Sequence, residues 1–327
     1  MALRRTDRRP ALRDSAADTV RGIGLVLLAV AVITLGDTAA KWALPAAGVG
    51  LVMVGRGVFG VVTILGIVIA SAGGVWPAWR RLRPVRWRLL AVRSLLQGVS
   101  TMTWYIAWMS MSLVDTFAIG FTAPLLMTLM AVPILGERLR WRRMAATVIG
   151  FGGVLIMVRP GGDLWHPVVA VLFAGIALMS LIRILTRLLS LTERPESIAL
   201  WLLVAQIPCG LLLLPLFPVR APLDAGVWIA LAILGVTNAV ANWLYARALA
   251  LAPVAAIAPY DYTSLIWGGL FGFLAFGDLP SWTTLAGAVV VAAAGLYNLH
   301  RERQLRSAEQ AASLVAGAGL AEAGGGE

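Results

Sequence analysis

The sequence predicts an all-α membrane protein that crosses the bilayer many times. Both its composition and the spacing of its apolar residues support this prediction. Of its 327 residues, 60% are hydrophobic and 13% are charged, whereas soluble domains average about 25% charged residues. The apolar residues fall in long runs that recur along the chain, and about 20 apolar residues are enough to span a bilayer as a helix. Because lipid offers the backbone no hydrogen bonds, we expect every run to be helical.

Ten runs are long enough to span the membrane, and Pro or Gly punctuates most gaps between them. The first run is too long for the core of a signal peptide, so we predict that it is a retained helix. The predicted ranges are 22–43, 48–71, 88–109, 114–135, 141–158, 166–187, 198–217, 226–246, 253–276 and 281–299.

The basic residues predict the orientation of these spans. With the N-terminus in the cytoplasm, 21 of the 27 basic residues lie in cytoplasmic segments, and only Arg159 and Arg220 lie on the other side. This asymmetry is typical of the positive-inside rule, so the basic residues report topology, and we expect no nucleic-acid partner. Residues 1–21 form a basic cytoplasmic segment, and 300–327 form a cytoplasmic tail that we predict to be largely disordered.

An internal repeat divides the spans into two halves. Gly136-Glu137 and Gly277-Asp278 each precede a Gly- and Ala-rich span, at an offset of 141 residues. The same offset pairs Gln97 with Asn238, Thr101 with Asn242 and Trp104 with Tyr245. Five helices are an odd number, so we predict that the halves, 22–158 and 165–299, are inverted in the membrane. Such repeats are a transporter architecture, with the substrate site between the halves.

Several short segments, in this order and spacing, resemble the drug/metabolite transporter superfamily of the EamA type. They are Asp115-Thr116-Phe117-Ala118, Thr122-Ala123-Pro124, Gly136-Glu137-Arg138, Leu185-Thr186-Arg187-Leu188-Leu189 and Ala248-Leu249-Ala250-Leu251-Ala252-Pro253. The resemblance implies transport of amino acids, amines, nucleotide-related compounds or vitamins across the bacterial inner membrane. The chain is also somewhat similar to members that take up S-adenosylmethionine and riboflavin.

The third span carries a polar stripe on one face, and the eighth span carries a similar stripe at the matching positions. Residues three and four apart share a helix face. The stripes consist of Arg93, Gln97, Ser100, Thr101, Trp104 and Trp108 on the third span, and Asn238, Asn242 and Tyr245 on the eighth. We predict that they line a substrate cavity with amide, hydroxyl and aromatic groups. The alternative is that they form hydrogen bonds between helices.

Ionisable residues at membrane depth are costly and are functional candidates by default. Asp37 and Lys41 are four residues apart on the first span, so they could form a pair. Arg56 and Arg183 are deep in their spans, where each could contact an anionic substrate group or neutralise a nearby carboxylate.

The ninth span carries a second polar stretch. Tyr260, Ser264 and Trp267 share one face, which we assign to the substrate cavity. Asp261 is the best candidate for a carboxylate that couples transport to protons or binds a cation. Its alternative role is an ion pair with Arg247 of the eighth span.

Other functions lack the residues that they require. The chain has no phosphate-binding loop for ATP, and its two histidines and Cys209 have no metal-ligand spacing. We therefore expect no cofactor and no metal site. The acidic residues are too scattered for an enzyme, and no segment resembles a channel filter. A membrane-embedded enzyme and a channel-like or interaction protein remain the alternatives to a transporter.

Overall fold

A computed structural model describes residues 16–123, 125–126, 129–130, 141–158, 167–189, 192–251, 258–297, 300 and 304. These parts of the chain contain helices and connecting turns and no strand, which confirms the predicted all-α class for the described residues. The helices are α1 (Ala16–Ala72), α2 (Val75–Leu82), α3 (Trp87–Trp108), α4 (Leu113–Gly120), α6 (Trp141–Val158), α7 (Pro167–Leu189), α8 (Pro195–Leu213), α9 (Ala225–Leu251), the 3-10 helix η1 (Ala258–Thr263), α11 (Ser264–Phe276) and a last helix, Trp282–Tyr297.

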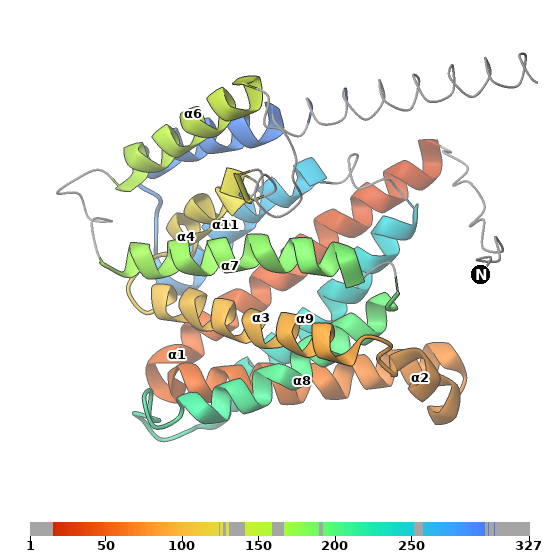
Figure 1. Ribbon diagram of the computed structural model, residues 1–327. Helices are drawn as coiled ribbons and strands as arrows, with labels where there is room; N and C mark the ends of the chain where they lie inside the picture. The colour runs from red at the N-terminus through yellow and green to blue at the C-terminus, as the bar shows by residue number, and fades with distance from the viewer. Residues whose placement is uncertain are drawn as a thin grey trace, which may run out of the picture.

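Helix α1 is two helices that meet at a sharp bend at Gly48. The backbone there has φ 71° and ψ 163°, a conformation that side chains beyond glycine rarely tolerate. The chain runs out along the first part of α1 and returns along the second (Figure 1). The two predicted spans 22–43 and 48–71 therefore correspond to the two arms of α1.

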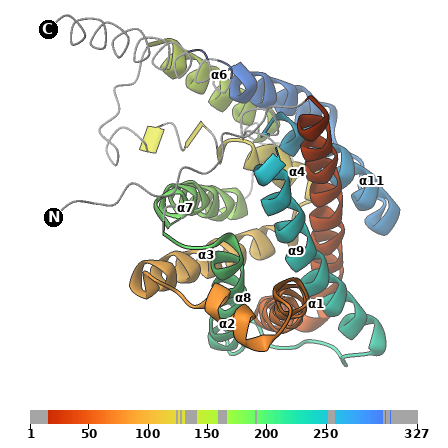
Figure 2. The same cartoon turned by 90° about the vertical axis from the view of Figure 1, so that its right-hand side faces the viewer.

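The long helices pack side by side. Helix α1 packs along α9 and α8, α3 packs on α7 and α8, and α11 packs on α4 and α1. Helix α6 lies beside the last helix (Figures 1 and 2), where Val154 and Met157 cluster with Ala288 and Val291. Glycines permit the closest crossings, since α1 and α8 meet where Gly50 faces Gly210.

The surface and length of these helices suit a lipid environment. Helices α1, α7, α8 and α9 are long and apolar enough to cross a membrane. Large apolar side chains such as Leu212 and Ile266 are exposed on the outside, at 77% and 68%. A soluble monomer rarely exposes so many, so these side chains mark a lipid-facing surface.

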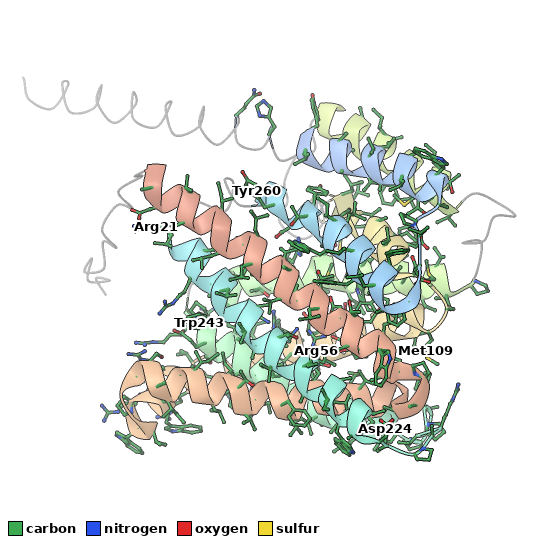
Figure 3. The ribbon with its side chains drawn as sticks, turned by 180° about the vertical axis from the view of Figure 1, so that it is seen from behind. Arg21, Arg56, Met109, Asp224, Trp243 and Tyr260 are labelled. Carbon is green, nitrogen blue, oxygen red and sulfur yellow. The ribbon has the colours of Figure 1, made fainter. Side chains whose placement is uncertain are left out.

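The two ends of the molecule are distinguishable in Figure 3. Arg21 lies at one end, which α2 shares, and Met109 and Asp224 lie at the other. The predicted fourth span, 114–135, is only partly described; residues 1–15 of the predicted N-terminal segment and almost all of 300–327 fall outside the described residues. The count of ten spans therefore stays a prediction.

Candidate functional site

A carboxylate of η1 and a phenol of α9 meet, and a guanidinium of α7 acts on both electrostatically. The Tyr245 hydroxyl on α9 donates to the carboxylate of Asp261 in η1, at 3.2 Å to Oδ2 and 3.3 Å to Oδ1. Arg183 of α7 is near enough to both to interact electrostatically. The structure thus brings together Asp261, Tyr245 and Arg183, which the sequence suggested separately.

The 3-10 helix positions this carboxylate. Pro259 cannot donate a backbone hydrogen bond, so a regular α-helix is interrupted here, and α11 begins only at Ser264. The hydroxyl of Ser264 donates to the Asp261 carbonyl at 2.8 Å, and that of Thr263 donates to the Tyr260 carbonyl at 2.6 Å. Short 3-10 turns are common at the start of an α-helix, and here the turn sets the position of Asp261 ahead of α11.

Aromatic rings extend from this carboxylate toward α3. Tyr262 packs on Phe121, with ring centroids 4.5 Å apart. Trp104 of α3 covers Gly120, where an added Cβ would lie 2.6 Å from the indole, so a larger residue would force the ring to shift. Trp104 also contacts Phe117 at 6.2 Å. Trp104, Phe121 and Tyr262 are partly exposed, and aromatic side chains of this kind can stack on another flat ring.

A second ionisable group lies inside the helices at Arg56. Its Nη1 donates to the Tyr105 hydroxyl at 3.3 Å, and it interacts electrostatically with Asp37. The Arg56 Nε atom is buried and has no hydrogen-bond partner among the described residues. Tyr105 also packs on Trp108, with centroids 5.3 Å apart. Trp108 in turn contacts Trp104, so aromatic rings continue from Tyr105 beside Arg56 to Trp104.

Much of the polar stripe on α3 forms contacts between helices. Arg93 Nε donates to Thr186 Oγ1 of α7 at 3.0 Å, and Thr101 accepts from Gln206 of α8 at 3.2 Å. Trp108 is 4% exposed and donates its indole N–H to Thr116 at 2.9 Å. These contacts match the interhelical alternative for Arg93, Thr101 and Trp108.

The other residues of the two stripes are either hydrogen-bonded and buried within the bundle or partly exposed. Asn242 donates to the Asn238 carbonyl one turn earlier, at 2.7 Å, and Asn238 is buried where α9 packs on its neighbours. Gln97 and Trp104 keep part of their side chains exposed. Tyr260 and Trp267 pack against Val26 and Val30 of α1. Trp104 and Tyr245 are thus the stripe residues that the structure places at the aromatic and acidic cluster.

Two ion pairs that the sequence left open as possibilities are not formed among the described residues, whose side chains make other contacts. Lys41 bonds Asp278 at 2.8 Å and lies over the Phe276 ring, 4.6 Å from its centroid. Its i, i+4 neighbour Asp37 instead faces Arg56, because the bend at Gly48 returns the second arm of α1 beside the first. The Arg247 guanidinium lies over the Trp243 ring, 4.2 Å from its centroid. The Asp261 carboxylate instead accepts the hydrogen bond from the Tyr245 hydroxyl.

Four residues of this region were not among the predicted site residues. Tyr262 directly follows the predicted Asp261, Tyr105 lies between Trp104 and Trp108 on the sequence, and Phe121 directly precedes the Thr122-Ala123-Pro124 motif. Gln206 was detectable as the lone amide in an apolar run. Phe121, Tyr262 and Tyr105 were missed because a single sequence does not show how each helix is rotated about its axis.

Long apolar helices with a small internal set of ionisable and aromatic groups define a multi-pass membrane protein with a polar site at membrane depth. The model of the EamA-like transporter family matches residues 20–159 and again 166–298. The chain belongs to this family, as the sequence motifs predicted.

Curated relatives carry transporter names. The chain is 25% identical over 271 residues to a riboflavin transporter of Brucella anthropi, covering 81% of this chain and 94% of that protein. It is 33% identical over 221 residues to a riboflavin transporter of Rhizobium johnstonii, covering 66% and 71%. An S-adenosylmethionine uptake transporter of Rickettsia bellii is 23% identical over 224 residues, covering 66% and 74%. The family and these relatives are transporters and not enzymes.

A solved structure supports the fold independently. One crystal structure superposes with a TM-score of 0.59 at 18% identity, over 87% of this chain and 97% of the other. At this identity the likeness concerns the fold alone.

Proposed function

We propose that this protein is a secondary transporter of the bacterial inner membrane that takes up a flat heteroaromatic metabolite of the riboflavin kind. The observation that carries the proposal is a set of partly exposed aromatic residues: Tyr262, which follows Asp261, packs on Phe121, and Trp104 covers the adjacent Gly120. Aromatic faces stack on a flat ring system. The polar edge of such a ring, or a hydroxylated side chain, can bond Asp261, Tyr245 and Arg183.

We propose the ten-span, inverted-repeat topology as the frame of this site. The family match falls on two successive segments of similar length, which supports a duplicated five-helix unit in halves 22–158 and 165–299. Both termini then lie in the cytoplasm, at the end occupied by Arg21 and α2. Substrate access alternates as helices of the two halves rock around the site between them.

In this mechanism Asp261 carries the coupling proton. A carboxylate at membrane depth is costly when charged and unpaired, so movement of its neighbours changes its preference for the proton. Tyr245 donates a hydrogen bond to the Asp261 carboxyl group in the present conformation, which favours the charged form of that group. Separation of α9 from η1 removes this donor and favours proton uptake, which links the proton to the conformational change.

The test is counterflow of labelled riboflavin in proteoliposomes that contain the purified chain. A carrier accelerates uptake when unlabelled solute is inside, whereas a channel gives unsaturable flux without exchange. Trp104→Ala should weaken affinity for the solute, and Trp282→Ala, at an 85% exposed position, serves as its control. Wild-type affinity in Trp104→Ala would remove the stacking role.

The coupling role has its own matched pair of variants. Asp261→Asn should abolish accumulation driven by a pH gradient while sparing exchange. Asp224→Asn is the control, because Asp224 caps α9 at 2.9 Å from Val227 N and asparagine caps equally well. Normal gradient-driven accumulation in Asp261→Asn would show that the carboxylate does not couple transport.

The second candidate substrate is S-adenosylmethionine, which carries a sulfonium cation and a flat adenine. A carboxylate among aromatic faces also suits a cation, which is the observation that favours it. A competition experiment separates the two solutes. We expect unlabelled riboflavin to block the uptake of labelled riboflavin, and we expect S-adenosylmethionine to leave that uptake unchanged. The reverse result would assign the site to the cationic solute.

A further inference from the structure

An apolar groove runs between α3 and α8 on the outside of the helix bundle, apart from the site above. It encloses about 270 Å³. One face of each helix lines it, with Trp87, Leu90, Ala91, Ser94 and Leu95 from α3, Trp201, Val204, Ala205 and Pro208 from α8, and Pro84 from the preceding loop. Positions 87 to 95 rise about 12 Å along α3, so the groove is long and narrow.

The end of this groove at the side of α2 is rigid. The buried Glu193 carboxylate accepts from the backbone amides of Val85 and Arg86, at 2.8 and 2.5 Å. Ser197 and Trp201 donate to the Leu82 carbonyl at 3.1 and 3.2 Å. These bonds hold the loop before α3 against the start of α8, so the mouth of the groove is a built feature.

Basic side chains surround this mouth. Arg83, Arg86, Arg88 and Arg194 are all exposed, and Arg88 lies over the Trp87 ring at 5.4 Å. The acidic groups nearby are Glu193, which the backbone amides already bind, and the partly buried Glu196. The helices α3 and α8 also begin here, and helix N-termini favour negative charge. The mouth is therefore positive overall.

We propose that this groove binds one acyl chain of an anionic phospholipid, with its phosphate at Arg83, Arg86, Arg88 and Arg194. A narrow apolar groove beneath a basic rim matches the two chemical parts of such a lipid. The groove surface offers a polar solute no hydrogen-bonding group, because Ser94 is 1% exposed. Trp87 and Trp201 occupy the depth where tryptophans favour the membrane interface.

The bound lipid would support the contact between α3 and α8 from outside. The same two helices are joined on the inside by the Gln206–Thr101 hydrogen bond. An acyl chain in the groove fills the space between the lipid-facing sides of α3 and α8. This filling favours the present spacing of the two helices.

Native mass spectrometry of the purified full-length chain tests the proposal without a transport substrate. The protein is titrated with phosphatidylglycerol or phosphatidylcholine of identical acyl chains. We expect one phosphatidylglycerol to be retained and to outcompete phosphatidylcholine. Leu95→Trp and Ala91→Trp should abolish its retention by filling the groove, and Leu95 is 50% exposed, so its variant has room to fold.

The charge of the mouth is tested separately. Arg83→Gln, Arg86→Gln and Arg88→Gln should each weaken phosphatidylglycerol binding about fivefold. The control Arg80→Gln, on α2 beside Trp76, should leave it unchanged. Equal binding of the two lipids, or full retention in folded Leu95→Trp, would overturn the proposal. A protein dimer that forms without lipid and dissociates in Leu95→Trp would overturn it as well, since a second copy would then fill the groove.

Discussion

The crossing of α1 and α8 makes Gly210→Ala a direct test of the packing. An added Cβ at Gly210 would lie 2.6 Å from the Gly50 carbonyl oxygen and 2.9 Å from the Val54 nitrogen. Both are backbone atoms, so no side-chain rotation relieves the clash and the helices must move apart.

The expected cost follows from two opposing effects. Overpacking of this kind destabilises by about 1–3 kcal/mol, whereas alanine is a better helix former than glycine by about 0.5–1 kcal/mol. A net loss of about 1–2 kcal/mol remains. Gly50→Ala clashes with the Gly210 carbonyl in the same way, so one separation of the helices relieves both, and the double variant should lose less than the sum.

The assay is the free energy of unfolding in an SDS titration followed by circular dichroism. Gly66→Ala is the matched control, because Gly66 lies on α1 and has nothing within 4 Å of an added Cβ. It should gain about 0.5–1 kcal/mol, so the same substitution changes sign between the two positions. A Gly210→Ala protein as stable as the wild type would refute the close crossing.

Three further variants test other contacts by the same unfolding assay. Asp278→Asn leaves the Lys41 ammonium, 14% exposed, without its partner and should cost about 1–3 kcal/mol; a double-mutant cycle with Lys41→Met that shows no coupling would argue against the pair. Glu193→Ala leaves two backbone amides unsatisfied and should cost about 2 kcal/mol, while Glu193→Gln keeps an acceptor and should lose clearly less. Gly48→Ala should cost about 1–3 kcal/mol, because the backbone at this position has a positive φ that is essentially restricted to glycine and an added Cβ would lie 2.6 Å from the Phe217 carbonyl oxygen; a variant as stable as the wild type would contradict the bend.

Individual residues show which features of the site could be predicted from the sequence and which could not. Asp261, Tyr245 and Arg183 were each identified because a polar group in an apolar run is costly and therefore conspicuous. Their spatial arrangement was not predictable, because the three residues come from three different helices. The pairing of Asp37 with Lys41 followed from local spacing, yet Lys41 bonds Asp278, which lies 237 residues away.

Backbone chemistry explains what the sequence alone determined. A chain in lipid satisfies its N–H and C=O groups within each helix, so length and apolarity of a run predict a span without knowledge of its neighbours. Both arms of α1 and the helices α3, α6, α7, α8 and α9 lie close to the predicted ranges for this reason. The family followed from short motifs in the same local way.

The tertiary structure decided which side chains meet. Lipid is as apolar as leucine, so no hydrophobic force selects the face that a helix turns inward. That choice depends on close crossings such as Gly50 with Gly210 and on turns such as Gly48. These contacts set the rotation of every helix, and the rotation places Trp104 beside Gly120 and Tyr245 against Asp261.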